Sequence, residues 1–95
     1  VPRHPSVTRD LSIEVDNALP AAEVRGTILT AAGPALVDVT EMDRYEGTEI
    51  TSGAVSLSYR LTFRAADRTL TDTEVQLSIN AVLGSLKETY GAKQR

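Results

Sequence analysis

The sequence predicts an α+β domain in which two helices pack on one face of an antiparallel sheet. Segments with strictly alternating apolar and polar residues indicate strands with one buried face. Two other segments carry apolar residues at helical spacing. These segments follow one another as strand, helix, strand, strand, helix and a short final strand. The 95 residues are enough for one two-layer core.

The first half of the chain contains a strand, a helix and a second strand. The first strand is predicted at residues 9–16, and its apolar face consists of Leu11, Ile13 and Val15. Pro20 suits the first position of the following helix, and the pair Gly33 and Pro34 ends it. The apolar stripe of this helix consists of Val24, Ile28, Leu29 and Ala32. The second strand is predicted at residues 36–45.

The second half contains the clearest strand, at residues 54–65, with an apolar face made of Val55, Leu57, Tyr59, Leu61 and Phe63. The next helix begins with a capping box of Thr71 and Glu74 and ends at Gly91. Its apolar stripe consists of Val75, Ile79, Val82, Leu83, Leu86 and Tyr90. A short strand or a tail follows. The complete order is that of a ferredoxin-like βαββαβ two-layer sandwich, which leaves the second sheet face open.

The second strand departs from its own pattern near its end. Residues 36–39 alternate with both valines expected inward, but continuing this alternation would bury Asp43 and Tyr45 and expose Met42. Burying a carboxylate to expose a methionine is unfavourable. We therefore predict a β-bulge at residues 40–42, where one extra residue returns Met42 to the core. The same bulge would turn Asp43 and Tyr45 onto the open face.

Composition excludes several classes of site. The chain has no cysteine, so it has no disulfide and no thiolate ligand, and its single histidine, His4, lacks metal-binding partners. No apolar run is long enough to span a membrane or to serve as a signal peptide. The absence of cysteine fits a cytoplasmic protein. The net charge of −3 disfavours nonspecific nucleic-acid binding. Residues 1–8 are predicted to be a linker, and residues 9–95 the domain.

Four stretches carry a resemblance to a known family. They are PSVTRDLSIEVD, MDRYEG, GAVSLSYRLTFRAADRTLTDTEV and GAKQR, and together they resemble the ferredoxin-fold anticodon-binding domain. In bacteria this domain ends the β subunit of phenylalanine–tRNA ligase. The resemblance implies no catalytic residue and no cofactor in this domain, with ATP and Mg²⁺ used elsewhere in a parent ligase. The implied partners are a phenylalanine tRNA, the rest of the β subunit and the α subunit, with no DNA and no membrane.

The resemblance also implies an RNA site on the open sheet face. Tyr45 would stack on the first anticodon base, and Asp43 and Ser56 would form hydrogen bonds with the same base. This fits the residue chemistry, because proteins recognise unpaired RNA bases by aromatic stacking and by contacts with base edges. The phosphate candidates are arginines: Arg60 and Arg64 on the open face, and Arg9 and Arg95 at the sheet margins. A local basic patch would suffice for binding RNA despite the negative net charge. The excess of acidic residues is expected largely on or beside the helices.

The residues alone leave other interpretations open. Tyr45 could pack at the rim of the domain, and Asp43 could begin a turn. Arg60 and Arg64 could pair with Asp10 or Glu14 across the sheet. Two other functions also suit a ferredoxin-like fold: a small-molecule regulatory domain, and a structural domain that docks its open face on another protein.

Overall fold

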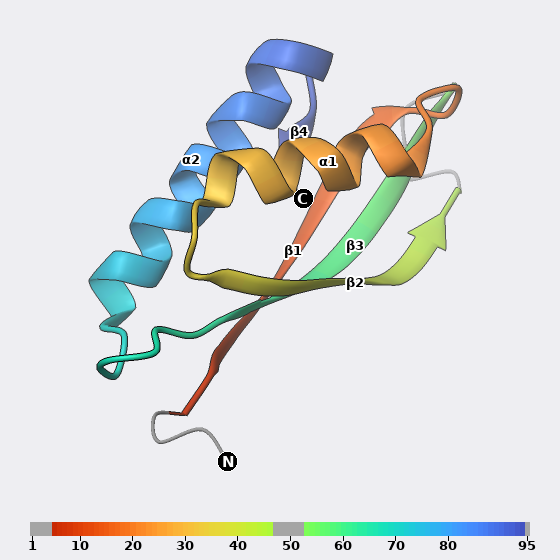
Figure 1. Cartoon of the computed structure of the whole chain (residues 1–95). Helices are drawn as coiled ribbons and strands as arrows, with labels where there is room; N and C mark the ends of the chain where they lie inside the picture. Colours follow the sequence, from red (N-terminus) through yellow and green to blue (C-terminus); the bar gives the residue numbers. More distant parts are fainter. Residues whose placement is uncertain (1–4, 47–52, 95) are drawn as a thin grey trace.

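The computed structural model describes residues 5–46 and 53–94 and confirms the predicted βαββαβ order. The elements are β1 (Val7–Asp16), α1 (Ala21–Ala32), β2 (Leu36–Tyr45), β3 (Ala54–Phe63), α2 (Asp72–Tyr90) and β4 (Lys93–Gln94). The four strands lie in the order β2-β3-β1-β4, and every neighbouring pair is antiparallel. Both helices lie on one side of this sheet (Figure 1), so the two-layer sandwich is confirmed.

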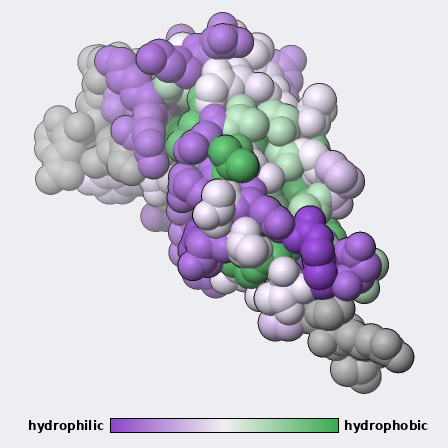
Figure 2. Space-filling view, turned by 90° about the vertical axis from the view of Figure 1, so that its left-hand side faces the viewer, coloured by the Kyte–Doolittle hydropathy of each residue, from purple (hydrophilic) through white to green (hydrophobic). Residues whose placement is uncertain are grey.

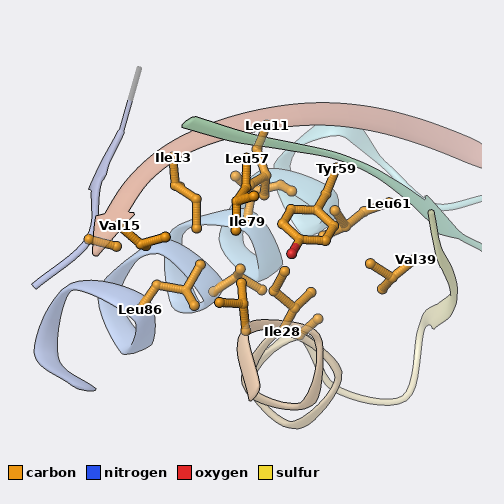
Figure 3. Close-up of a cluster of buried hydrophobic side chains, with 14 of the residues drawn as sticks. Leu11, Ile13, Val15, Ile28, Val39, Leu57, Tyr59, Leu61, Ile79 and Leu86 are labelled. Carbon is orange, nitrogen blue, oxygen red and sulfur yellow. The ribbon is translucent and has the colours of Figure 1, made fainter. Parts of the chain in front are cut away.

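The core fills the space between the sheet and the helices (Figure 3). It contains the alternating apolar residues of β1 and β3 and one face of each helix. Tyr59, at 1% exposure, points from β3 toward the helix layer, and its hydroxyl has no hydrogen-bond partner among the described residues. Burial raises the pKa of Tyr59 to about 12, and the negative charge of Glu41 adds to this effect.

The ends of both helices follow from local chemistry. Thr71 caps α2, because its hydroxyl accepts a hydrogen bond from the Glu74 amide over 3.2 Å. A hydrogen bond from Arg68 lowers the pKa of the Glu74 carboxyl, and the Thr71 backbone contributes to the same shift. Gly91, with a φ of 69°, ends α2 in the left-handed conformation that glycine adopts without strain. Gly33, with a φ of 84°, follows the last residue of α1.

Several details differ from the sequence prediction. β1 begins at Val7, two residues early, and β3 ends at Phe63, two residues early. Pro20 is the N-cap of α1 and not its first helical residue. Leu29 is 45% exposed, because the buried stripe of α1 is narrower than its apolar residues suggest.

The side of the molecule in Figure 2 is mostly hydrophilic with small hydrophobic patches.

Neither helix in the described part of the chain has the length and apolar character needed to cross a lipid bilayer. His4 lies outside the described residues.

Candidate nucleic-acid interface

A β-bulge in β2 determines which way the predicted site residues face. Met42 has no partner in β3, whereas the residues on either side of it pair with consecutive residues of β3. The predicted bulge is therefore confirmed. After it, Asp43 lies opposite Ser58 and Tyr45 lies opposite Ser56. Because directly opposed residues share a face, Asp43 and Tyr45 lie on the open face, as predicted.

The prediction that the bulge returns Met42 to the core was wrong. Met42 is 49% exposed. An extra residue belongs to neither alternating set of side chains, and β2 is an edge strand. The inward position expected for Val37 was also wrong, because a second register shift lies between Leu36 and Asp38 and leaves Val37 48% exposed. Val39 is buried as expected.

A depression of about 360 Å³ lies on the open face at this end of the sheet. Its lining comes from β1, β2 and β3 and consists of Ser12, Asp43, Tyr45, Ser56 and Ser58. The structure thus brings together three predicted site residues, which are Asp43, Tyr45 and Ser56. Ser12 and Ser58 were not among the predicted site residues. Both occupy polar positions of alternating strands, but only the strand register shows that they border the same depression.

The depression offers a stacking surface beside hydrogen-bonding groups. Tyr45 is 47% exposed. The Asp43 carboxylate accepts a hydrogen bond from the Arg44 amide over 2.8 Å, which orients it and leaves lone pairs available. The hydroxyls of Ser12 and Ser58 are 2.9 Å apart and hydrogen-bonded, and either can donate. This set of groups can stack on a planar ring, accept hydrogen bonds from its edge and donate hydrogen bonds to it.

Ser56 is the least accessible of the predicted base contacts. It is 6% exposed, although it lies on the open face. The residues directly opposite it on the neighbouring strands are Glu14 and Tyr45. Ser56 therefore lies at the floor of the depression, whereas Ser58 is partly exposed.

Arg60 lies on the open face but has a carboxylate partner there. Its Nε and Nη2 donate to Oδ1 and Oδ2 of Asp10 over 2.8 and 3.1 Å. The hydrogen bond with Arg60 lowers the pKa of the Asp10 carboxyl, and the same contact raises the pKa of Arg60. The pairing of Arg60 with Asp10, left open by the sequence, is therefore present.

The remaining predicted arginines do not border the depression. Arg64 lines a different cavity with Val37 and Leu70, beyond the end of β3. Arg9 lies opposite Leu61 on the helix-facing side, and its Nη2 is 3.4 Å from Oδ1 of Asp72 at the start of α2. Arg95 lies outside the described residues.

At the open-face positions that the strand pairing defines, carboxylates outnumber cations, so these positions do not form the expected basic patch. The cations at its positions are Arg60 and Lys93, whereas the carboxylates are Asp10, Glu14, Asp16, Asp38 and Asp43. Acidic residues are thus not confined to the helices. A surface with this balance of charge attracts a phosphate backbone poorly.

Within residues 5–46 and 53–94, no three His, Asp or Glu side chains form a group that could hold a metal ion.

The fold and the depression define a ferredoxin-like sandwich with a polar platform on its uncovered sheet face. Residues 2–95 match the family model of the ferredoxin-fold anticodon binding domain, and the chain belongs to this family. Family membership favours the anticodon-binding prediction over the small-molecule regulatory and protein-docking alternatives.

Curated relatives align with the whole chain. It is 42% identical over 95 residues to a phenylalanine–tRNA ligase beta subunit of Bacillus cereus, covering all of this chain and 12% of the relative. It is 45% identical to that of Symbiobacterium thermophilum, covering all of this chain and 10% of the relative. For Bacillus subtilis the values are 35% identity, all of this chain and 12% of the relative. The chain thus spans about a tenth of the length of these relatives.

Proposed function

We propose that this domain binds the anticodon loop of a phenylalanine tRNA and recognises the first anticodon base on its open sheet face. Tyr45 stacks on the base, and Asp43 and Ser56 form hydrogen bonds with it. The observation that carries this proposal is the bulge at Met42, after which the aromatic ring and the carboxylate border one depression. The family match supplies the RNA class.

The chemistry of the depression suits guanine, the first base of a phenylalanine anticodon. The Watson–Crick edge of guanine presents two donors, N1–H and N2–H, which a carboxylate accepts together. Stacking of a base on an aromatic side chain contributes about 1–3 kcal/mol. Ser56 can either donate or accept.

In this proposed function the domain is part of a larger cytoplasmic enzyme, the phenylalanine–tRNA ligase. The names of the relatives and their greater length support this part. The domain would position the tRNA, while the rest of the β subunit and the α subunit carry the chemistry with ATP and Mg²⁺. No covalent step is assigned to this domain.

The phosphate contacts are proposed in an order set by the ion pairs. Among the described arginines Arg64 is the first candidate, and Arg95, which lies outside the described residues, stays a candidate without a rank. Arg60 and Arg9 would have to exchange Asp10 and Asp72 for phosphates. Their contribution to RNA affinity is therefore smaller than their charge alone suggests.

The test is a titration of the chain with a fluorescent hairpin that carries the phenylalanine anticodon, and with a hairpin in which adenine replaces the first anticodon guanine. A pair of lost hydrogen bonds to a base edge costs about 1–3 kcal/mol, so the adenine hairpin should bind roughly 5- to 150-fold more weakly. Tyr45→Ala should weaken binding of the guanine hairpin. Tyr45→Phe is the matched control, because it keeps the ring and should bind nearly as the unmodified chain does.

Equal affinity for the two hairpins would refute recognition of the first base. Loss of binding in Tyr45→Phe as well as Tyr45→Ala would refute stacking as the role of Tyr45.

A further inference from the structure

A row of polar side chains crosses the depression from β2 to β1. Asp43 lies directly opposite Ser58, and Ser58 lies directly opposite Ser12. Directly opposed residues have Cβ atoms about 5 Å apart, which is similar to the width of the hydrogen-bonding edge of one base. The row therefore presents a carboxylate, then a hydroxyl, then a second hydroxyl bonded to the first.

This row matches the order of groups on guanine. Along the Watson–Crick edge, the donors N2–H and N1–H are followed by the acceptor O6. A guanine whose two donors face Asp43 brings O6 beside the nearest group on the same face that can donate. On β3 that group is the hydroxyl of Ser58.

We propose that Ser58 is a further base-recognition residue, which donates a hydrogen bond to O6 of the first anticodon guanine, and that Ser12 is its positioning residue. This inference rests on the proposed function and makes the recognised base more specific. Ser58 would recognise an acceptor of the base, O6, whereas Asp43 recognises only its donors, N1–H and N2–H.

The contact between the two serines fixes how Ser58 can act. The oxygens are 2.9 Å apart, and a hydroxyl has one donor and two acceptor lone pairs. When Ser12 donates to Ser58, the Ser58 hydrogen is free to point to the ligand. Two hydrogen bonds in series, from Ser12 to Ser58 and from Ser58 to the ligand, also polarise the Ser58 hydroxyl and strengthen its hydrogen bond to the ligand.

Accessibility also favours Ser58 for this role. Ser58 is partly exposed, whereas Ser56 is 6% exposed. The Ser58 hydroxyl can therefore meet a base without displacement of a neighbouring side chain.

The test replaces one atom of the RNA. In a hairpin with 6-thioguanine at the first anticodon position, sulfur, a poorer acceptor, replaces O6, while N1–H and N2–H remain. The unmodified chain should bind the guanine hairpin roughly three- to tenfold more tightly than the 6-thioguanine hairpin, the effect of one neutral hydrogen bond. Ser58→Ala should bind both hairpins equally. Ser12→Ala should reduce the ratio, and Ser12→Thr, which keeps the hydroxyl, should restore it.

The matched control is Thr62→Val, which removes a hydroxyl from the same face of β3 but outside the depression. It should keep the full ratio between the two hairpins. A full ratio in Ser58→Ala, or a lost ratio in Thr62→Val, would overturn the role of Ser58. The adenine hairpin separates the two levels of the proposal. If guanine is preferred over adenine and Ser58→Ala keeps the 6-thioguanine ratio, only this inference fails. If guanine and adenine bind equally, the proposed function fails and this inference fails with it.

Discussion

Arg60 and Asp10 lie directly opposite each other on β3 and β1 and are joined by two parallel hydrogen bonds, of 2.8 and 3.1 Å. The contact occupies the guanidinium fork that would otherwise suit a phosphate. Because Arg60 is paired with Asp10, its positive charge does not neutralise the other carboxylates of the open face. The pair therefore lowers the pKa of Asp10 and leaves less of the Arg60 guanidinium available to other anions.

The first prediction concerns the titration of Asp10. The hydrogen bond from Arg60 lowers the pKa of Asp10 below its ordinary value of 3.8. Because the folded value is depressed, the stabilising contribution is present above the unfolded value and is lost as the pH falls through the folded value. Carbon-detected NMR of the carboxyl group should show this low pKa, and Arg60→Gln should return it toward 3.8. An unchanged Asp10 titration in Arg60→Gln would contradict the assignment.

The second prediction concerns nonspecific RNA binding. Asp10→Asn removes a negative charge from the open face and releases Arg60 for phosphates. Guanine and adenine hairpins should both bind more tightly, and the slope of log K against log salt should steepen by about one. The control is Glu23→Gln, which makes the same change of charge on α1, outside the sheet. Equal gains in both variants would assign the effect to net charge and not to the Arg60–Asp10 pair.

The sequence predicted the fold because local signals agreed along the chain. Alternation in β3 and the Thr71 cap each specified an element without knowledge of its neighbours. The bulge was also predictable, because a buried Asp43 would be costly. The exposed position of Met42 was not, since a broken alternation shows that a residue is extra but not where its side chain goes.

The parts of the site that were missed depend on strand register. Ser12 and Ser58 are 46 residues apart, and nothing in either strand alone shows that their hydroxyls meet. The strand register also determines which way Arg9 faces. Arg9 is paired with the buried Leu61 on the helix-facing side of the sheet and forms an ion pair with Asp72, so its positive charge lies away from the open face.

The third prediction compares two deletions of equal length in β2. Removing Met42 should close the bulge into a regular ladder, because the residues flanking it already pair with consecutive residues of β3. Asp43 and Tyr45 then stay on the open face, and the preference for guanine over adenine should persist. Removing Arg44 should turn Tyr45 to the other face, since strand side chains alternate, and should abolish the preference.

Titrations with the guanine and adenine hairpins measure the affinities of both deletion variants, and circular dichroism checks that each variant is folded. Loss of the preference after deletion of Met42 would show that the bulge aims the side chains in a way that pairing alone does not.

The fourth prediction applies the same chemical change to two tyrosines and expects opposite results. The Tyr59 hydroxyl is buried without a partner among the described residues, so Tyr59→Phe should raise the free energy of unfolding by about 1 kcal/mol. The Tyr90 hydroxyl lies 2.8 Å from Thr27 Oγ1 and 3.2 Å from the Glu23 carbonyl oxygen. Tyr90→Phe removes these hydrogen bonds and should lower the free energy of unfolding by about 0.5–1.5 kcal/mol. Urea denaturation measures both changes.

A pH series adds a second measurement to the Tyr59 prediction. Because burial raises the pKa of Tyr59 from 10.0 to about 12, the unfolded chain loses this proton first as the pH rises. The free energy of unfolding is therefore unaffected by this titration below pH 10.0 and decreases as the pH rises from 10.0 to about 12. Tyr59→Phe should remove this part of the alkaline destabilisation and also the corresponding tyrosinate absorbance. A lower unfolding free energy in Tyr59→Phe at neutral pH would mean that the hydroxyl has a stabilising partner.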